Sequence, residues 1–128
     1  MTPNPNELFV YIDRLIAATK SGHVDWAKAN PTTYIWTSSG TVPARLMIQR
    51  VDRSPADRMK AQALNPTLRL PVRYYVFQAV ELPNAVKLSI NGSEDQEPNA
   101  KLEELYETIT SGFARKGLDF LKSILPPE

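Results

Sequence analysis

The chain has 128 residues, of which 42% are hydrophobic and 23% charged, and this size and composition are typical of one globular domain spanning residues 1–128. Its formal net charge of +1 excludes a strong overall attraction to nucleic acid, and no apolar run approaches the roughly 20 residues that cross a bilayer. Cysteine is absent and the N-terminus lacks the features of an export signal, so we expect a cytoplasmic protein with no disulfides, thiol chemistry or membrane association.

The first predicted element is a helix over residues 5–20. A capping residue, a proline suited to the first turn and an acid that can complete a capping box indicate its start: Asn4, Pro5 and Glu7. Apolar residues at helical spacing then predict one buried face, formed by Leu8, Ile12, Leu15 and Ile16. Gly22 follows Lys20 and supplies a natural end.

Residues 23–26 are predicted to begin a sheet, with Val24 and Trp26 in the core and His23 and Asp25 outside. The alternative is catalytic, because His23 could act as a base that Asp25 orients. A triad also needs a nucleophile, and no Gly-x-Ser-x-Gly elbow is present. We therefore interpret His23 as an exposed residue at the junction and expect that the protein is not an enzyme.

Turn signals separate further strands, expected at residues 32–37, 41–48, 70–81 and 86–90. Within the long connection over residues 52–69, Ser54-Pro55 predicts a short helix that runs to Ala63. Connections of this length inside a small domain are often functional or mobile.

The last predicted element is a long helix that follows the acidic stretch at residues 93–99. One apolar stripe is expected along it, with a possible bend at Gly112 or Gly117: Leu102, Leu105, Tyr106, Ile109, Phe113, Phe120, Leu121, Ile124 and Leu125. An antiparallel sheet of four to five strands with both helices on one face would bury all these apolar stripes together. We therefore predict an α+β fold with a helix at each end of the chain.

Two short motifs resemble a group of small, mostly uncharacterised bacterial and phage domains. The first is the stretch from Thr19 through Gly22 and Val24 to Trp26, and the second is Leu102-Glu103-Glu104-Leu105-Tyr106. In those domains a helix ends in Thr-x-x-Gly-x-Ile/Val-x-Trp, a β-meander follows, and a helix with Leu-x-x-Leu-Tyr closes the chain. The resemblance implies the fold and brings no catalytic residue, and the basic insertion at residues 52–69 departs from the pattern.

Metal and cofactor sites are not expected. One histidine and no cysteine leave only carboxylates as ligands, and no Asp-x-Asp-x-Asp-Gly loop or glycine-rich phosphate loop occurs. Glu94, Asp95 and Glu97 could hold calcium loosely, but a solvated acidic turn explains them better.

The basic segment over residues 45–73 is the main candidate for a binding site. Its seven basic and two acidic residues give +5, and it lies close to aromatic residues; the candidate binding residues are Arg50, Arg53, Arg58, Lys60, Arg73, Tyr75 and Trp36. Arginine with aromatic side chains occurs both in protein hot spots and in nucleic-acid sites, although a solvated loop is the plain alternative. Strands with apolar residues on both faces suggest an aromatic sheet face free of helices, although the loop at 52–69 could cover it.

Self-association is a further hypothesis. Residues 94–107 carry six acids and one lysine, or −5, which could complement the basic segment within one molecule or across two copies. We expect a non-catalytic cytoplasmic accessory protein of bacterial or phage type. It would bind a protein partner or itself through the basic loop and the aromatic sheet face, with nucleic-acid or nucleotide binding as the alternative.

Overall fold

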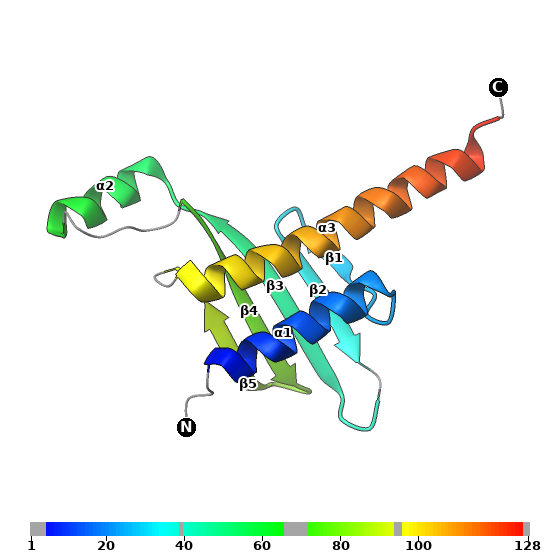
Figure 1. The fold of residues 1–128 in the computed structure, drawn as a ribbon, viewed down its shortest axis with the longest axis horizontal. Coiled ribbons are helices and arrows are strands. Elements are labelled where there is room, and N and C mark those ends of the chain that lie inside the picture. Colours follow the sequence, from blue (N-terminus) through cyan, green and yellow to red (C-terminus); the bar gives the residue numbers. More distant parts are fainter. Residues whose placement is uncertain (1–4, 39, 66–71, 94–95, 127–128) are drawn as a thin grey trace.

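Two helices lie across one face of a five-stranded sheet in the computed structural model, which describes residues 5–38, 40–65, 72–93 and 96–126 (Figure 1). The elements in chain order are α1 (Pro5–Lys20), β1 (Ala27–Asn30), β2 (Thr33–Ser38), β3 (Ala44–Asp52), α2 (Pro55–Leu64), β4 (Arg73–Glu81), β5 (Ala85–Asn91) and α3 (Gln96–Ile124). The predicted α+β class, with helices at both ends and on one sheet face, is confirmed. Three residues named in the sequence analysis lie outside the described residues: Asn4, Glu94 and Asp95.

The sheet is an antiparallel meander in which each strand pairs with its neighbours in the chain, in the order β1-β2-β3-β4-β5. The register places four apolar residues directly opposite one another across the central strands: Tyr34, Ile48, Phe77 and Ile90. Directly opposed residues share a face, so this row defines the side on which α1 and α3 lie (Figure 1).

The hydrophobic core lies between this face and the two helices. It consists of one buried cluster that includes Ile12 and Ile16 from α1, the Tyr34 row, and Leu102, Leu105, Tyr106 and Ile109 from α3. Ile48 and Leu105 are fully buried. Each such aliphatic side chain contributes roughly 1.5–3 kcal/mol to stability. The three tyrosines of the cluster also pack edge to face or tilted, with Tyr106 contacting both Tyr34 and Tyr75.

The end of α1 folds back on itself, which corrects the predicted strand at residues 23–26. Gly22 has a φ of +84°, and Ala18 O accepts hydrogen bonds from His23 N at 3.0 Å and Val24 N at 3.3 Å. The Trp26 indole N–H then donates to the Thr19 hydroxyl at 3.0 Å. Because these bonds hold the segment against the helix, the sheet begins only at Ala27. The expected inward placement of Val24 and Trp26 is confirmed.

The first turn of α3 replaces a missing strand beside β4. Strand β5 ends opposite Val76, and just beyond it Gly92 N still donates to Tyr75 O at 2.9 Å, but the ladder pairs no β5 residue with Tyr75 N or Arg73 O. The buried Asn99 side chain fills the gap, because its carbonyl accepts from Tyr75 N at 2.9 Å and its amide donates to Arg73 O at 3.2 Å. Gly92 leaves room for it, since a Cβ there would lie 2.4 Å from Asn99 Oδ1.

Two helical segments extend beyond the sheet in Figure 1: α2 on one side and the C-terminal part of α3 on the other. The predicted short helix is confirmed, with Ser54 as its N-cap, but none of its residues is buried. Helix α3 continues without interruption through Gly112 and Gly117. The expected buried stripe ends at Phe113, which corrects the prediction for Phe120, Leu121, Ile124 and Leu125, because all four are exposed.

Candidate functional site

The structure divides the predicted binding residues among separate surfaces. Arg50 and Arg73 lie on the helix-covered side of the sheet, as their pairing with Tyr75 and Asp52 shows. Arg53 lies on the opposite side, where its guanidinium stacks on Tyr74. The remaining basic residues, Arg58 and Lys60, belong to α2.

The predicted aromatic sheet face is not exposed. Tyr75 is 3% exposed and lies under α3, and Trp36 is partly buried against the same core. Tyr34 and Phe77 are buried with them. The physical reason is the register, which places all four aromatic residues on the face that the helices cover. The loop over residues 52–69 is therefore not needed to bury them.

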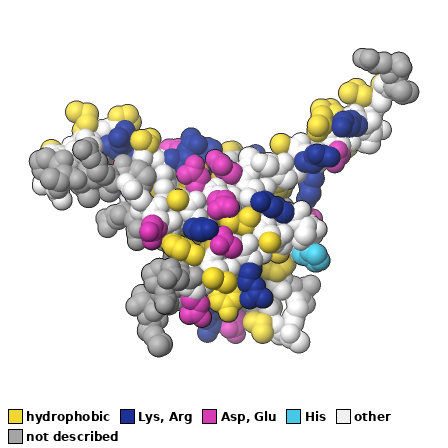
Figure 2. Space-filling view, in the orientation of Figure 1, with side chains coloured by type: hydrophobic (Ala, Val, Ile, Leu, Met, Phe, Trp, Pro, Cys, Tyr) yellow, Lys and Arg dark blue, Asp and Glu magenta, His cyan; other side chains and the backbone are white. Residues whose placement is uncertain are grey.

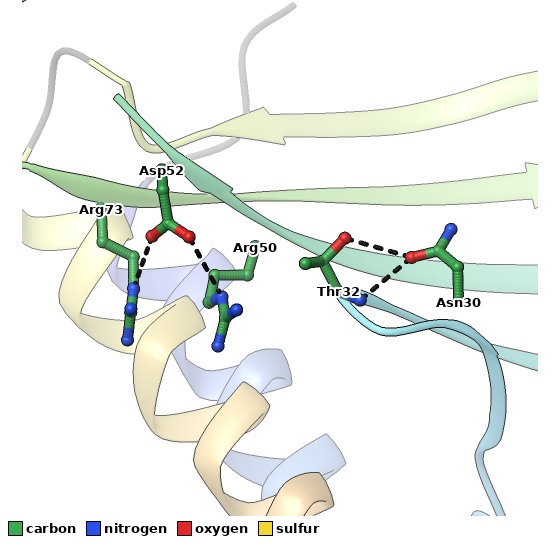
Figure 3. Close-up of polar contacts among 5 residues, drawn as sticks. All are labelled: Asn30, Thr32, Arg50, Asp52 and Arg73. Carbon is green, nitrogen blue, oxygen red and sulfur yellow. Dashed lines mark hydrogen bonds and ion pairs between the residues drawn. The ribbon is translucent and has the colours of Figure 1, made fainter. Parts of the chain in front are cut away.

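Asp52 organises the arginines at the ends of β3 and β4 (Figure 3). Its carboxylate accepts a hydrogen bond from Arg73 Nε at 2.7 Å and lies 3.7 Å from Arg50 Nε. The hydrogen bond from Arg73, more than the charge of either arginine, holds the pKa of Asp52 below its ordinary value, and the same bond raises the pKa of Arg73.

A neighbouring turn holds Arg50 in place from the β2 side (Figure 3). The Asn30 side-chain oxygen accepts hydrogen bonds from Thr32 N at 3.0 Å and Thr32 Oγ1 at 3.1 Å. This Asx turn directs the Thr32 carbonyl toward β3, where it accepts from Arg50 N at 2.9 Å. The cluster is therefore built on backbone that two strands fix.

A pocket of about 380 Å³ lies between this cluster and α3. Its lining includes two arginines, two tyrosines and polar residues of α3: Arg50, Arg73, Tyr75, Tyr106, Glu107 and Thr110. Burial is the main factor that raises the pKa of the Tyr75 and Tyr106 hydroxyls, so both rings stay neutral at physiological pH.

The charges of this pocket do not favour a phosphate ligand. Arg50 and Arg73 are matched by two carboxylates, those of Asp52 and Glu107, so the local sum is close to zero. An anion that bound to Arg50 and Arg73 would have to compete with the carboxylate of Asp52, which already pairs with both guanidinium groups. The arrangement is better suited to neutral or apolar side chains that contact the tyrosine rings.

The uncovered face of the sheet has a different character. We define the open face by two central rows and two flanking pairs: Thr33, Gln49, Val76 and Asn91; Ile35, Met47, Gln78 and Ser89; Val51 with Tyr74; and Arg45 with Val80. Its centre is aliphatic and amide-bearing. Arg45 carries its formal charge, Arg53 stacks on Tyr74 at its edge, and the residues of these rows and pairs include no carboxylate.

Sequence reasoning expected a sheet face free of helices but assigned the wrong residues to it. The aromatic residues proposed for that face lie under the helices, because the register places them there. The uncovered side instead carries the second apolar set, Ile35, Met47, Val51 and Val76, and apolar residues on both sides of a strand do not reveal which side is covered.

The residues considered for catalysis do not form a site. His23 Nδ1 lies 2.5 Å from Ser21 Oγ, whereas the Asp25 carboxylate pairs with Lys116 of α3. Both residues are exposed, as expected. Within the described part of the chain, no group of three or more potential metal ligands comes together, and no helix is long and apolar enough to cross a membrane.

In comparisons with known proteins, no family model, curated protein or solved structure matches this chain.

Proposed function

We propose that this chain is a non-catalytic module that binds another protein across the open face of its sheet, with α2 as a flanking arm. The observation that supports this most directly is the open face itself. Four partly buried aliphatic side chains share this face without a covering helix: Ile35 opposite Met47, Val76 opposite Gln49, and Val51 opposite Tyr74. A partly apolar sheet face gains stability when a further layer covers it.

The positive charges at the edge of the open face indicate what kind of partner fits. Arg45 and Arg53 lie on the open face, and Arg53 is held in place by Tyr74 and by a hydrogen bond to Ser93 O at 2.5 Å. An arginine held on a tyrosine ring loses little conformational entropy on binding, and this pair is typical of interface hot spots. The partner we propose is therefore a protein segment with apolar residues at its centre and acidic residues around them.

Helix α2 adds contact surface next to this face. It has no buried residue, and Met59 and Leu64 are 70% and 90% exposed. Lys60 and Arg58 make it basic, as Arg45 and Arg53 make the edge of the open face. We include it because a helix without tertiary packing is only marginally stable in water, and a partner would stabilise it.

Nucleic-acid binding has less support than protein binding. A phosphate backbone is gripped by cations that line one path, and here Arg50 and Arg73 are separated from Arg53 by the sheet. The cytoplasmic, accessory role of bacterial or phage type remains part of the proposal, since the lack of cysteine and the resemblance of the two motifs favour it.

The test is capture of partners from a native lysate with paired variants. Gln49→Glu and Gln78→Glu place negative charge at the centre of the open face without changing side-chain size, and Gln96→Glu is the matched control at an exposed position of α3. We expect the wild type and the control to retain the same protein through nuclease treatment, and the double variant to lose it by about tenfold.

Two outcomes would contradict the proposal. One is equal capture by the double variant and the control, which would show that the open face is not the contact surface. The other is recovery of nucleic acid with all captured proteins lost on nuclease treatment, which would favour a phosphate-binding role. Circular dichroism of each variant verifies that the fold is intact.

A further inference from the structure

The C-terminal part of α3 projects from the sheet with no buried residue, and near its start Lys116 pairs with Asp25. Every residue from Ala114 to Pro126 is exposed, and five large side chains in this segment are 48–62% exposed: Leu118, Phe120, Leu121, Ile124 and Leu125. Figure 2 shows yellow side chains gathered on this projecting end. The apolar side chains of this segment leave water only if another surface covers them.

Three of these side chains continue one line along α3. An α-helix turns by about 100° per residue, so residues seven apart lie nearly above one another. Leu121 lies above Ala114 and Glu107, and Leu125 lies above Leu118 and Ser111. We call this line the α3 seam. Phe120 and Ile124 lie on a different side of the helix, above Phe113.

The N-terminal half of the same seam forms a wall of the pocket of about 380 Å³ described above. Glu107, Ser111 and Ala114 all line that pocket, whose other lining residues include Tyr75 and Tyr106. The pocket and the exposed leucine line therefore lie on one side of one helix. Two copies of the helix packed antiparallel along the seam would place the leucines of each beside the pocket of the other.

The charges of α3 favour that antiparallel arrangement. In its first half, Glu97, Glu103, Glu104 and Glu107 against Lys101 give −3; in its second half, Arg115, Lys116 and Lys122 against Asp119 give +2. An antiparallel pair brings the acidic first half of each helix beside the basic second half of the other. The two helix dipoles also point in opposite directions, which is favourable. Pairing of the leucine halves with each other would instead bring Lys122 against its own copy.

We propose that two copies of this chain associate as a two-fold dimer through the α3 seam, with Leu118, Leu121 and Leu125 of each copy covering the Tyr75–Tyr106 pocket of the other. Leu118, Leu121 and Leu125 of each copy form the apolar part of this interface, whereas Phe120 and Ile124 lie outside it. The open face of the sheet stays free in this dimer, so each dimer presents two of them.

The first experiment measures the dimer dissociation constant of the full chain by sedimentation equilibrium. Leu121→Glu places a charge in the seam, and Phe120→Glu places the same charge on the neighbouring residue, which is similarly exposed but lies about 100° away around the helix. We expect Leu121→Glu to weaken the dimer by at least about tenfold and Phe120→Glu to change it by less than about threefold.

A charge exchange then tests the antiparallel orientation. Lys122→Glu and Glu107→Lys each place like charges within about one turn of each other across the proposed pair, so each variant weakens association. The double variant restores opposite charges, and we expect it to recover most of the wild-type affinity. A parallel pair, or a partner other than a second copy, gives no such rescue.

A wild-type chain that stays monomeric up to roughly 200 µM would overturn the dimer, as would equal effects of Leu121→Glu and Phe120→Glu. A monomer that co-sediments with vesicles of anionic lipid would also overturn it and would identify a lipid surface as the occupant. Gln49→Glu with Gln78→Glu is expected to leave the dimer intact, which separates this result from the test of the open face.

Discussion

Replacement of Asn99 by alanine tests whether a side chain can substitute for a strand at the end of β5. Asn99 is 7% exposed and bonds two backbone groups of β4, Tyr75 N and Arg73 O. The bond to Tyr75 N is buried, so the substitution leaves that N–H without a partner. Asn91 provides a matched control, because the hydrogen bond that its side chain accepts from Ser93 N is exposed.

The expected loss of stability follows from these contacts. A buried donor left unpaired costs about 1–3 kcal/mol, and the more accessible carbonyl of Arg73 adds roughly 0.5–1 kcal/mol. Alanine is the better helix former by about 0.6 kcal/mol, which offsets part of this loss. We therefore expect Asn99→Ala to lower the free energy of unfolding by about 2 kcal/mol, and Asn91→Ala by less than about 0.5 kcal/mol.

Urea denaturation followed by circular dichroism measures both values, with the slope m compared between variants to verify that unfolding stays two-state. Asn99→Asp refines the result, since it keeps the acceptor for Tyr75 N but loses the donor to Arg73 O, and its loss should be smaller than that of alanine at neutral pH. If Asn99→Ala and Asn91→Ala lose the same free energy, the amide of Asn99 does not replace a strand and the reasoning is refuted.

Three further predictions concern the helix junction and the arginine cluster. Thr19→Val removes the acceptor of the Trp26 indole N–H, so we expect a loss of about 1–2 kcal/mol and a red shift of tryptophan fluorescence; an unchanged spectrum would contradict this. Gly22→Ala must adopt a positive φ and should cost about 1 kcal/mol in urea denaturation. Asp52 has a lowered pKa in the folded state, so its contribution to stability is present at neutral pH and is lost as the pH falls below about 4. Asp52→Asn should flatten this acid loss, and parallel pH profiles of unfolding for variant and wild type would refute the pairing with Arg73.

The two proposals together describe a protein with two independent contact surfaces. In these proposals the α3 seam joins two copies of the chain, and the open face binds a different protein. A dimer that presents two open faces binds a bivalent partner with an effective concentration that one chain cannot provide. The dimer and the partner can be measured separately, because the residues that test them lie on different elements.

Local sequence signals predicted the order of the elements well. Apolar periodicity identified both long helices and most of the strands, and Ser54-Pro55 marked the start of α2, because these signals depend on spacing and on backbone constraints within a few residues. The junction at residues 23–26 was the exception. Its alternation suggested a strand, but hydrogen bonds to Ala18 and Thr19 hold it against α1.

The candidate site depended far more on tertiary structure. The clustering of basic residues at 45–73 is real in the sequence, but a strand alternates its side chains between two faces, so neighbours such as Arg50 and Arg53 end on opposite sides of the sheet. Which apolar face of β3 and β4 is buried is likewise decided by where the helices pack. Periodicity shows that both faces are apolar and does not choose between them.

The sequence by itself determined the α+β class, the helix at each end and the residues able to form a core, because these follow from side-chain spacing. The tertiary structure alone decided that Asn99 completes the edge of β4, that the aromatic residues lie inside, and that the open face and the α3 seam remain uncovered. Those features depend on contacts between residues far apart in the chain. The spacing of side chains along a sequence does not determine which distant surfaces come into contact.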